Sequence, residues 1–459
     1  MFSCLVVLSF RVRPYARVFF VFLLQIFHLS KINKKNKVIL IKNTNISMSG
    51  VDFMIDIVRK LERKEHEDKM EKMELVAQML KKQRKKYKLT LTKASAGICS
   101  VSYLSIIENN LLENIEEKYI LKLCDRMNLN YNDISSFDEV CSMETLAFSL
   151  LNKDYEKIEY YYNCLNKEIS NVKSDIVKGY YYLINDDYQK LNEIIGTIYE
   201  VSSTLSSTEY FMFIILVQEY YIRQYKMNKA LESFKELCKI GCRFKPIEYL
   251  IIYQGLRIYF HTNDYMNFLK FYYKIVKTDD LLLPYELEII AKIMKSSLEV
   301  LQGGDNDLDS LNLCTHTSNK QYDEEIKYYQ MLLLYNLKKY DQVKNQIENY
   351  NFSNEGFKVL YNLASFSSNT FKVKERRSAH DCYHKIFDSF LADYFLATSS
   401  NISKKETLYI LKEYRKYEDE YSHHLYDSFI FRVFCDIYTS TTYYKEAMGY
   451  LKKNIKMVN

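Results

Sequence analysis

Residues 89–110, LTLTKASAGICSVSYLSIIENN, are the stretch of this chain from which its fold is most readily inferred. They predict two short helices joined by a tight turn. Thr90 and Ser100 stand where a hydroxyl group caps the N-terminus of a helix. Gly97 lies between them and permits the sharp turn that such a connection needs.

The second of these helices is expected over residues 101–108. Leu104 and Ile107 lie three residues apart, so they share one face and are expected to point inward. The outward side of the helix then carries Val101, Ser102, Tyr103, Ser105 and Ile106.

A basic helix is predicted directly before this stretch. Between residues 70 and 95 there are eight basic and two acidic residues, and this excess of six equals the net charge of the whole chain, +6. A solvated helix face is the usual meaning of such a run, so charge alone leaves nucleic-acid binding as an alternative. Apolar residues at helical spacing give the helix its inner face: Leu75, Val76, Met79 and Leu80.

Together, these residues resemble the helix-turn-helix of the Xre (Cro-like) transcription regulators, and most closely the form found in the Rgg/PlcR group. The resemblance covers residues 70–136, and its most specific part is residues 96–110, AGICSVSYLSIIENN. It implies a five-helix DNA-binding domain whose recognition helix is residues 101–108. The residues that it implies contact bases or phosphates are Arg84, Lys85, Thr90, Ser100, Val101, Ser102, Tyr103, Ser105 and Ile106.

Ile106 departs from the family pattern, in which this position is commonly Arg or Lys. Losing that cation removes a phosphate or guanine contact, and a base contact is worth about 1–3 kcal/mol of discrimination. DNA binding would then be weaker, tuned to a thymine methyl group, or lost. The resemblance also implies that Glu108 has a structural role more than a role in reading DNA.

The remaining residues, 138–459, predict helix after helix with short polar breaks. Pairs of residues nine apart recur, and in each pair the second residue is expected near the start of the next helix: Tyr182 and Leu191, Tyr221 and Ala230, Tyr259 and Phe268, Leu334 and Val343, Tyr438 and Ala447. This pattern resembles the tetratricopeptide repeat, although its intervals exceed the usual period of ~34 residues. We therefore expect an all-α protein with a degenerate tetratricopeptide-like α-solenoid of about eight to nine helix pairs.

A stack of helix pairs has a concave groove, and such grooves bind extended peptides or partner helices. The chain has 43 tyrosines, whose rings and hydroxyl groups suit peptide recognition, although most of them are expected to pack in the core. The candidate peptide-binding residues are Gln218, Tyr221, Tyr253, Tyr259 and Asn336.

The first 53 residues are expected to be a leader that is disordered or not part of the native protein. Their longest uncharged apolar run, residues 18–29, is shorter than the ~20 residues that a membrane span needs. A membrane anchor is the alternative for this segment. Residues 54–69 are expected to form a charged helical lead-in to the DNA-binding domain.

Composition and motifs exclude several other classes. With 10 Gly and 3 Pro, the chain has too few turn-forming residues for an all-β sandwich, and its ten scattered cysteines are typical of reduced thiols. No glycine-rich phosphate loop or nucleophile elbow is present, so neither an enzyme nor a cofactor is expected. His380 with His384, and His423 with His424, each lack further ligands, so no metal site is expected.

The sequence therefore predicts a cytoplasmic transcriptional regulator without a membrane partner. The resemblance implies a homodimer on a double-stranded DNA operator, because one recognition helix covers only a half-site. It also implies control by a small signalling peptide in the repeat groove, as in quorum sensing. The alternative is a non-enzymatic scaffold whose repeats bind a protein partner and whose helix-turn-helix no longer reads DNA, and Ile106 favours this alternative.

Overall fold

The structure is a computed structural model, and its regular elements are all helices in the part of the chain that it describes. The expected leader, the lead-in helix and His380 lie outside that part. The predicted all-α class is confirmed. The described residues are 71–109, 116–129, 141–165, 171–303 without 240 and 243, 317, 319–350, 355–372, 383–399, 403–417, 420–441 and 443–458.

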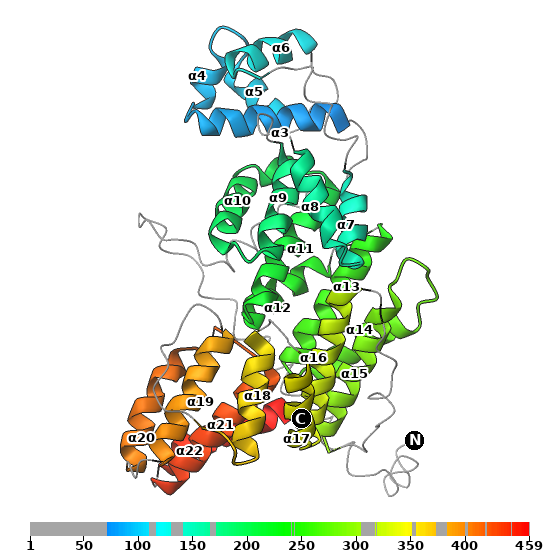
Figure 1. Cartoon of the computed structure of the whole chain (residues 1–459). Helices are drawn as coiled ribbons and strands as arrows, with labels where there is room; N and C mark the ends of the chain where they lie inside the picture. The colour runs from blue at the N-terminus through cyan, green and yellow to red at the C-terminus, as the bar shows by residue number, and fades with distance from the viewer. Residues whose placement is uncertain are drawn as a thin grey trace, which may run out of the picture. The chain divides into compact units, whose positions relative to one another are not determined.

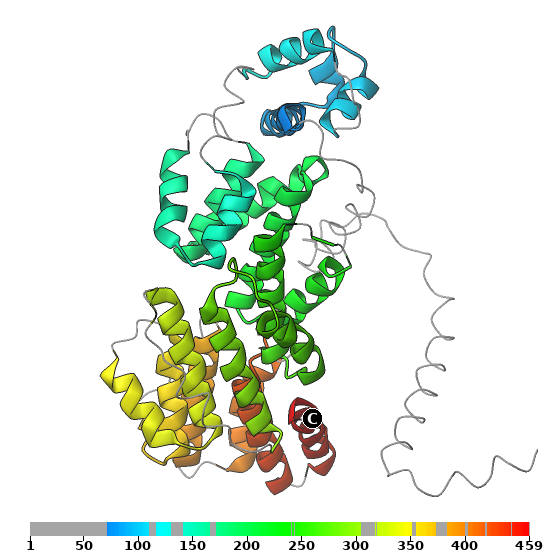
Figure 2. The same cartoon turned by 90° about the vertical axis from the view of Figure 1, so that its right-hand side faces the viewer.

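The first four helices of the described residues share one small hydrophobic core, and we call them the four-helix unit: α3 (Glu71–Lys86), α4 (Leu91–Ser95), α5 (Val101–Glu108) and α6 (Glu117–Arg126) (Figure 1). Figure 2 looks nearly along α3 and shows the other three helices gathered on one side of it. The core is formed by Val76, Met79, Leu80, Ala94, Leu104, Ile107, Ile120, Leu123, Cys124 and Met127.

Local sequence determines where these short helices begin. Thr90 Oγ1 accepts a hydrogen bond from the Lys93 N–H at 3.3 Å, and Ser100 Oγ accepts one from the Tyr103 N–H at 3.1 Å. Gly97 has φ +71°, a left-handed conformation that favours glycine. The predicted caps and turn are therefore confirmed.

The rest of the described chain is a series of helices that pack in consecutive pairs, consistent with a helical repeat. Their bounds are α7 (Met143–Leu151), α8 (Tyr155–Cys164), α9 (Val172–Ile184), α10 (Tyr188–Glu200), α11 (Ser207–Arg223), α12 (Met227–Leu237), α13 (Lys245–His261), α14 (Tyr265–Val276), α15 (Tyr285–Leu301), α16 (Lys320–Asn336), α17 (Tyr340–Asn349), α18 (Glu355–Ser367), α19 (Tyr383–Ser399), α20 (Lys404–Leu411), α21 (His424–Ser440) and α22 (Tyr444–Val458). Two short 3₁₀ helices, η2 (Ser202–Thr204) and η4 (Lys412–Tyr417), follow α10 and α20.

One turn conformation recurs between paired helices. A non-glycine residue with φ between 51° and 60° stands between α7 and α8, and again at intervals of 33, 39, 38 and 75 residues. Since a left-handed non-glycine residue is uncommon, its recurrence marks equivalent positions of a repeat. The first of these positions, between α7 and α8, adds one helix pair to the repeat. The residue pairs with nine-residue spacing in the sequence did not include this helix pair. The residues are Lys153, Asp186, Tyr225, Asn263 and Lys338.

The nine-residue spacing noted in the sequence corresponds to contact between paired helices. In every such pair, the second residue lies in the first turns of the second helix and is buried: Leu191, Ala230, Phe268, Val343 and Ala447. These side chains fill the space between paired helices, which explains why the spacing recurs.

The C-terminal helices return to the middle of the repeat series. The Ser422 N–H, just before α21, donates a 2.8 Å hydrogen bond to the carbonyl oxygen of Tyr225 in the turn after α11. The centre of the His423 ring lies 5.0 Å from that of the same tyrosine, with the two rings tilted by 54°. The start of α21 therefore lies beside α13 and α16, where Phe260 contacts His424 and the Tyr328 hydroxyl contacts His423.

Candidate functional site

The third helix of the four-helix unit, α5, presents an exposed N-terminal turn. Leu104 and Ile107 are fully buried, as predicted, while Val101 is 41% exposed and Ser102 is exposed. A capped, exposed first turn with hydroxyl groups is an arrangement that can reach base edges in a groove.

The remaining predicted contacts on α5 are more enclosed. The Tyr103 ring is half-buried and lies edge-on against the Tyr119 ring at 5.3 Å. Ser105 accepts a 2.8 Å hydrogen bond at its carbonyl oxygen from Asn109 Nδ2, and Ile106 is half-buried. Of the residues that the sequence analysis placed on the outer face, Val101 and Ser102 are therefore the most accessible.

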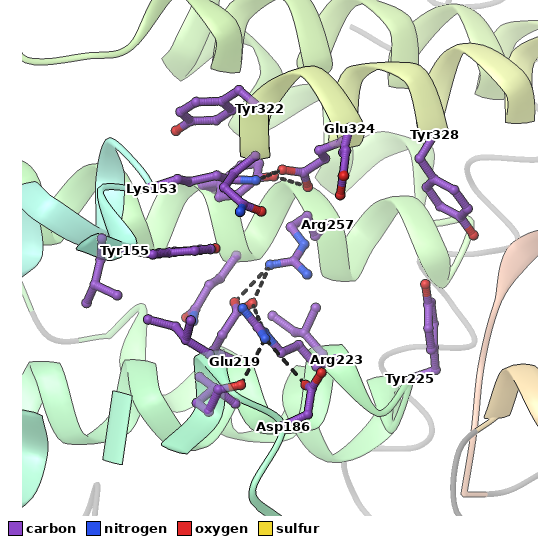
Figure 3. A pocket seen from close by; sticks show the side chains of 18 of the residues that line it. Lys153, Tyr155, Asp186, Glu219, Arg223, Tyr225, Arg257, Tyr322, Glu324 and Tyr328 are labelled. Atoms are coloured by element: carbon purple, nitrogen blue, oxygen red, sulfur yellow. Dashed lines mark hydrogen bonds and ion pairs between the residues drawn. The ribbon is translucent and has the colours of Figure 1, made fainter. Parts of the chain in front are cut away.

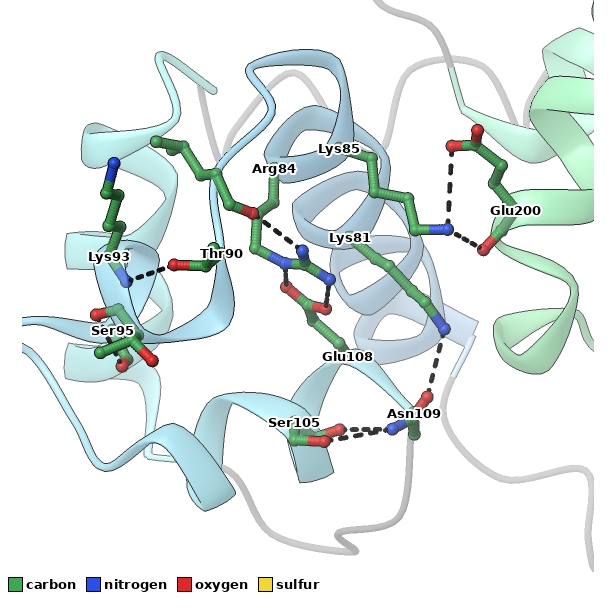
Figure 4. Close-up of polar contacts among 12 residues, drawn as sticks. Lys81, Arg84, Lys85, Thr90, Lys93, Ser95, Ser105, Glu108, Asn109 and Glu200 are labelled. Atoms are coloured by element: carbon green, nitrogen blue, oxygen red, sulfur yellow. Dashed lines mark hydrogen bonds and ion pairs between the residues drawn. The ribbon is translucent and has the colours of Figure 1, made fainter. Parts of the chain in front are cut away.

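Arg84 lies inside the four-helix unit (Figure 4). Its Nε and Nη2 donate to the two carboxylate oxygens of Glu108 at 2.6 and 2.7 Å, and its Nη1 donates to the Leu89 carbonyl oxygen at 3.0 Å. The two charged side chains are only 13% and 2% exposed. This bidentate pair ties α3 to α5, and it agrees with the structural role expected of Glu108.

Other basic and polar residues of α3 contact the repeat helices. Lys85 Nζ donates a 2.7 Å hydrogen bond to the carbonyl oxygen of Glu200, at the end of α10. Lys82 forms an ion pair with Asp175 of α9. Since these cations already have protein partners, part of the basic face predicted for α3 is a contact surface within the chain.

A buried side chain of α3, Gln78, adds to the contact between the four-helix unit and the repeat helices. Gln78 Nε2 donates to the Thr204 carbonyl oxygen at 3.0 Å and to Glu209 Oε2 at 2.7 Å. Glu209 also closes a capping box with Ser206 at the start of α11. Burial raises the pKa of Glu209. The four-helix unit is thus joined to the first repeats by specific polar contacts.

Three lysines around α4 remain exposed. They are Lys86 at the end of α3, Lys88 in the following turn, and Lys93 in α4. They precede the Ser100 cap in sequence, and their exposed ammonium groups can meet an anionic partner.

A cavity of about 840 Å³ lies among the repeat helices (Figure 3). Its walls include the α7–α8 turn and parts of α9, α11, α13, α16, α18 and α19, so residues far apart in sequence meet there. This volume is within the range of about 300–1,000 Å³ that small-molecule sites occupy. Five acidic and five basic side chains line it: Asp186, Glu219, Glu324, Glu325 and Glu355, and Lys153, Arg223, Arg257, Lys320 and Lys385.

Ion pairs organise one wall of the cavity. The Glu219 carboxylate accepts two hydrogen bonds from Arg257 Nη1, at 2.8 and 3.0 Å, and lies 3.4 Å from Arg223 Nε. Burial by itself would raise the pKa of Glu219, but the two guanidinium groups outweigh it and lower that pKa to about 2. The wall therefore holds fixed charges at neutral pH.

A second group of charges stands on the opposite wall. Glu325 of α16 forms an ion pair with Lys153 and accepts a hydrogen bond from the Tyr253 hydroxyl. Burial alone would raise the pKa of Glu325, yet Lys153 and Arg257 lower it. Both walls thus offer charged groups that are already oriented by protein partners.

Of the five candidate peptide-binding residues, Tyr253 lines this cavity and the other four are not among its lining residues. Gln218 is fully buried and donates to Ser233 Oγ at 3.3 Å, and Asn336 donates to Ser297 Oγ at 2.8 Å. The rings of Tyr221 and Tyr259 are buried, and they pack against neighbouring aromatic rings.

The charged residues of the cavity were missed by the sequence analysis, although one signal was present. Glu219 and Arg257 lie 38 residues apart, which matches the interval between the left-handed turns of α11–α12 and α13–α14. Charges at equivalent positions of consecutive repeats point to the same side of a solenoid.

Comparisons with known proteins identify no family: no family model, no curated protein and no solved structure matches this chain. In the part of the chain that the structure describes, no helix has the length and apolar character needed to cross a bilayer.

Proposed function

We propose that this chain is a DNA-binding transcriptional regulator controlled by a small peptide. In this proposal the four-helix unit reads DNA, and the cavity among the repeat helices holds the peptide. The observation that carries it is the capped, exposed first turn of α5, with Val101 and Ser102 outward, on a unit that has its own core.

The DNA contacts divide into two kinds. Ser102 and Val101 would meet base edges, the hydroxyl by hydrogen bonding and the isopropyl group against a thymine methyl. Lys86, Lys88 and Lys93 would contact phosphates and supply salt-sensitive affinity. Arg84 would act through Glu108 by holding α5 in place, because its guanidinium already has three acceptors.

The resemblance to Xre-type regulators with tetratricopeptide-like repeats supports this assignment. It adds a homodimer acting in the cytoplasm, since two-fold symmetry doubles the contacts to an operator. The balanced charges of the cavity suit a short peptide with groups of both signs. A peptide carboxylate would compete with Glu219 for the Arg257 guanidinium, and a peptide amine would compete with Lys153 for Glu325.

The DNA assignment is tested by selecting duplexes from a randomised pool with the full chain and titrating them at several salt concentrations. Replacing Lys86, Lys88 and Lys93 by Ala should reduce the slope of log affinity against log salt by roughly 3, since each phosphate contact contributes about 0.9. The matched control replaces three exposed lysines near α20 by Ala, and its slope should not change: Lys404, Lys405 and Lys412.

Sequence choice is tested by Ser102→Ala, which changes an exposed side chain and should leave folding intact. It should lower the preference for selected over random duplexes by about 1–3 kcal/mol while binding at low salt remains. Equal affinity of the unaltered chain for selected and random duplexes would contradict the proposal.

The peptide assignment is tested by incubating the full chain with a pool of short synthetic peptides and identifying the retained ones by mass spectrometry. Leu250→Trp adds an indole to the cavity lining, so it should abolish retention. Leu451→Trp changes a partly exposed leucine on α22, outside the lining, and should retain the same peptides. Equal retention by both variants would place the peptide elsewhere.

A second candidate function is a protein-interaction scaffold. The observation that favours it is the engagement of Arg84, Lys82 and Lys85 within the chain, which removes cations from the surface that DNA would meet. A scaffold of this kind would show weak binding to any duplex, and that binding would vanish with added salt.

A further inference from the structure

We propose that His261, His423 and His424 form a binding site for one divalent transition-metal ion, of which zinc is the best match. This inference is independent of the proposed function. His261 is the last residue of α13, His423 is the N-cap residue of α21, and His424 is the first residue of that helix.

The distances among the three rings match a shared ion. Their ligand atoms all lie within 4.8 Å of one another. The ring centres are separated by 4.9 Å for His261 and His423, 5.6 Å for His261 and His424, and 5.1 Å for His423 and His424. Two imidazoles on one tetrahedral zinc ion, with Zn–N of about 2.1 Å, have ring centres roughly 5 Å apart. Rotation of the rings would bring the nitrogens to the roughly 3.4 Å separation that coordination needs.

Three of the six ring nitrogens of this cluster lack the hydrogen-bond partners that buried polar groups usually have. The rings of His423 and His424 are fully buried, and that of His261 is 3% exposed. Both ring nitrogens of His424 and Nδ1 of His261 have no hydrogen-bond partner among the described residues. A buried polar atom without a partner is unfavourable, and a metal ion is one partner that three imidazoles can share.

His423 differs because both of its nitrogens have partners. Its Nδ1 accepts from the Leu425 N–H at 3.3 Å, and its Nε2 lies 3.1 Å from the Tyr328 hydroxyl. Coordination by His423 replaces one of these hydrogen bonds with a bond to the metal.

The backbone that carries the histidines is fixed by a second layer of contacts. Asp427 Oδ2 accepts hydrogen bonds from the His423 N–H at 2.9 Å and from Ser422 Oγ at 3.0 Å. The Ser422 N–H donates to the Tyr225 carbonyl oxygen at 2.8 Å. These contacts fix the backbone position of His423 beside the other two histidines.

The cavity gives the site a route of entry. His261 lines the cavity, as do the nearby residues Tyr225 and Tyr328, so an ion can arrive from that side. Three histidines leave a fourth position on tetrahedral zinc, and a water molecule or a ligand group in the cavity can occupy it. Imidazole ligands suit zinc, copper and nickel more than magnesium or calcium.

The test is a titration of the full chain, freed of metals by a chelator, with Co²⁺ followed by visible absorption. We expect intense four-coordinate absorption that saturates at one ion per chain and is displaced by Zn²⁺. His261→Asn and His424→Asn should each lose it, while Tyr409→Asn, at a 78% exposed position of α20, should retain it. Only the faint absorption of hydrated Co²⁺ in the unaltered chain would overturn the proposal, as would full retention in both cluster variants.

A second variant keeps the test decisive if an asparagine variant fails to fold, which far-UV circular dichroism would show. His424→Cys replaces one ligand by another, so it should bind Co²⁺ and add a sulfur-to-cobalt charge-transfer band in the near ultraviolet. That band requires residue 424 to contact the ion. A folded His424→Cys chain that binds Co²⁺ without the band would overturn the assignment of this ligand.

Discussion

The Arg84–Glu108 pair gives a prediction whose magnitude follows from its geometry. Arg84→Met removes a guanidinium that makes two hydrogen bonds to a carboxylate that is 2% exposed. The carboxylate then remains buried without its cation, which typically costs about 3–5 kcal/mol. The matched control is Lys118→Met, because the Lys118–Glu116 pair is 62% and 59% exposed, and such pairs contribute about 0–1 kcal/mol.

Hydrogen exchange of the full chain, read by mass spectrometry on peptides from α3 to α6, reports the local free energy of opening of this unit. Arg84→Met should lower that free energy by several kcal/mol, and Lys118→Met should leave it nearly unchanged. The double variant Arg84→Met/Glu108→Leu should recover most of the loss, because no buried charge is left unpaired. An Arg84→Met value within about 1 kcal/mol of the control would refute the reasoning.

The same double variant separates two roles of Arg84. If Arg84 holds α5 in place, the double variant should bind selected DNA with nearly unchanged salt dependence. If Arg84 contacts a phosphate, as the sequence resemblance implied, the slope of log affinity against log salt should fall by roughly 0.9.

Two further predictions concern the repeat helices. A Cβ at Gly255 would clash with the buried Phe234 ring, so Gly255→Ala should lower the free energy of unfolding, measured in urea, by about 1–3 kcal/mol. The control is Gly196→Ala, which should not lower it, because nothing in the described residues lies within 4 Å of the added Cβ. Glu219 has a folded pKa of about 2, below its ordinary 4.5, so its ionised form stabilises the fold above pH 4.5 and this contribution is lost as the pH falls toward 2. The side chain is only 20% exposed, so solvent screens this interaction little, and a pKa lowered from 4.5 to about 2 corresponds to about 3 kcal/mol of folding free energy. Glu219→Gln should therefore reduce stability at neutral pH and flatten the acid limb of a curve of stability against pH. An unchanged acid limb would contradict this assignment.

The parts of the fold that depend on neighbouring residues could be predicted from the sequence. Thr90 and Ser100 cap helices through hydrogen bonds to residues three positions on, and Gly97 provides a turn, so all three act within a few residues. The burial of Leu104 and Ile107 followed from helical periodicity alone.

The partners of the charged and histidine side chains could not be predicted in this way. Glu219 and Arg257 meet across two repeats, and His261 meets His423 after a return of the chain through α19 and α21. No metal site was expected from the sequence, because His423 and His424 have no further ligand close to them in the chain. The structure supplies a third histidine 162 residues earlier in the chain, which no local spacing reveals.

The position of α3 connects the two proposed activities. Its Val76 and Leu80 belong to the core on which α5 packs, while its Gln78 and Lys82 contact η2, α9 and α11. The helix α9 that holds Asp175 also contributes Tyr180 and Leu183 to the cavity lining. A peptide that shifts α9 therefore acts on the ion partner of α3, and through α3 on the helix that would read DNA. Coupling between sites is typically about 1–3 kcal/mol, which is comparable to the loss of one buried polar contact at this junction. Under the proposed function, control of DNA affinity would require no change in α5 itself, only a change in how firmly α3 is held.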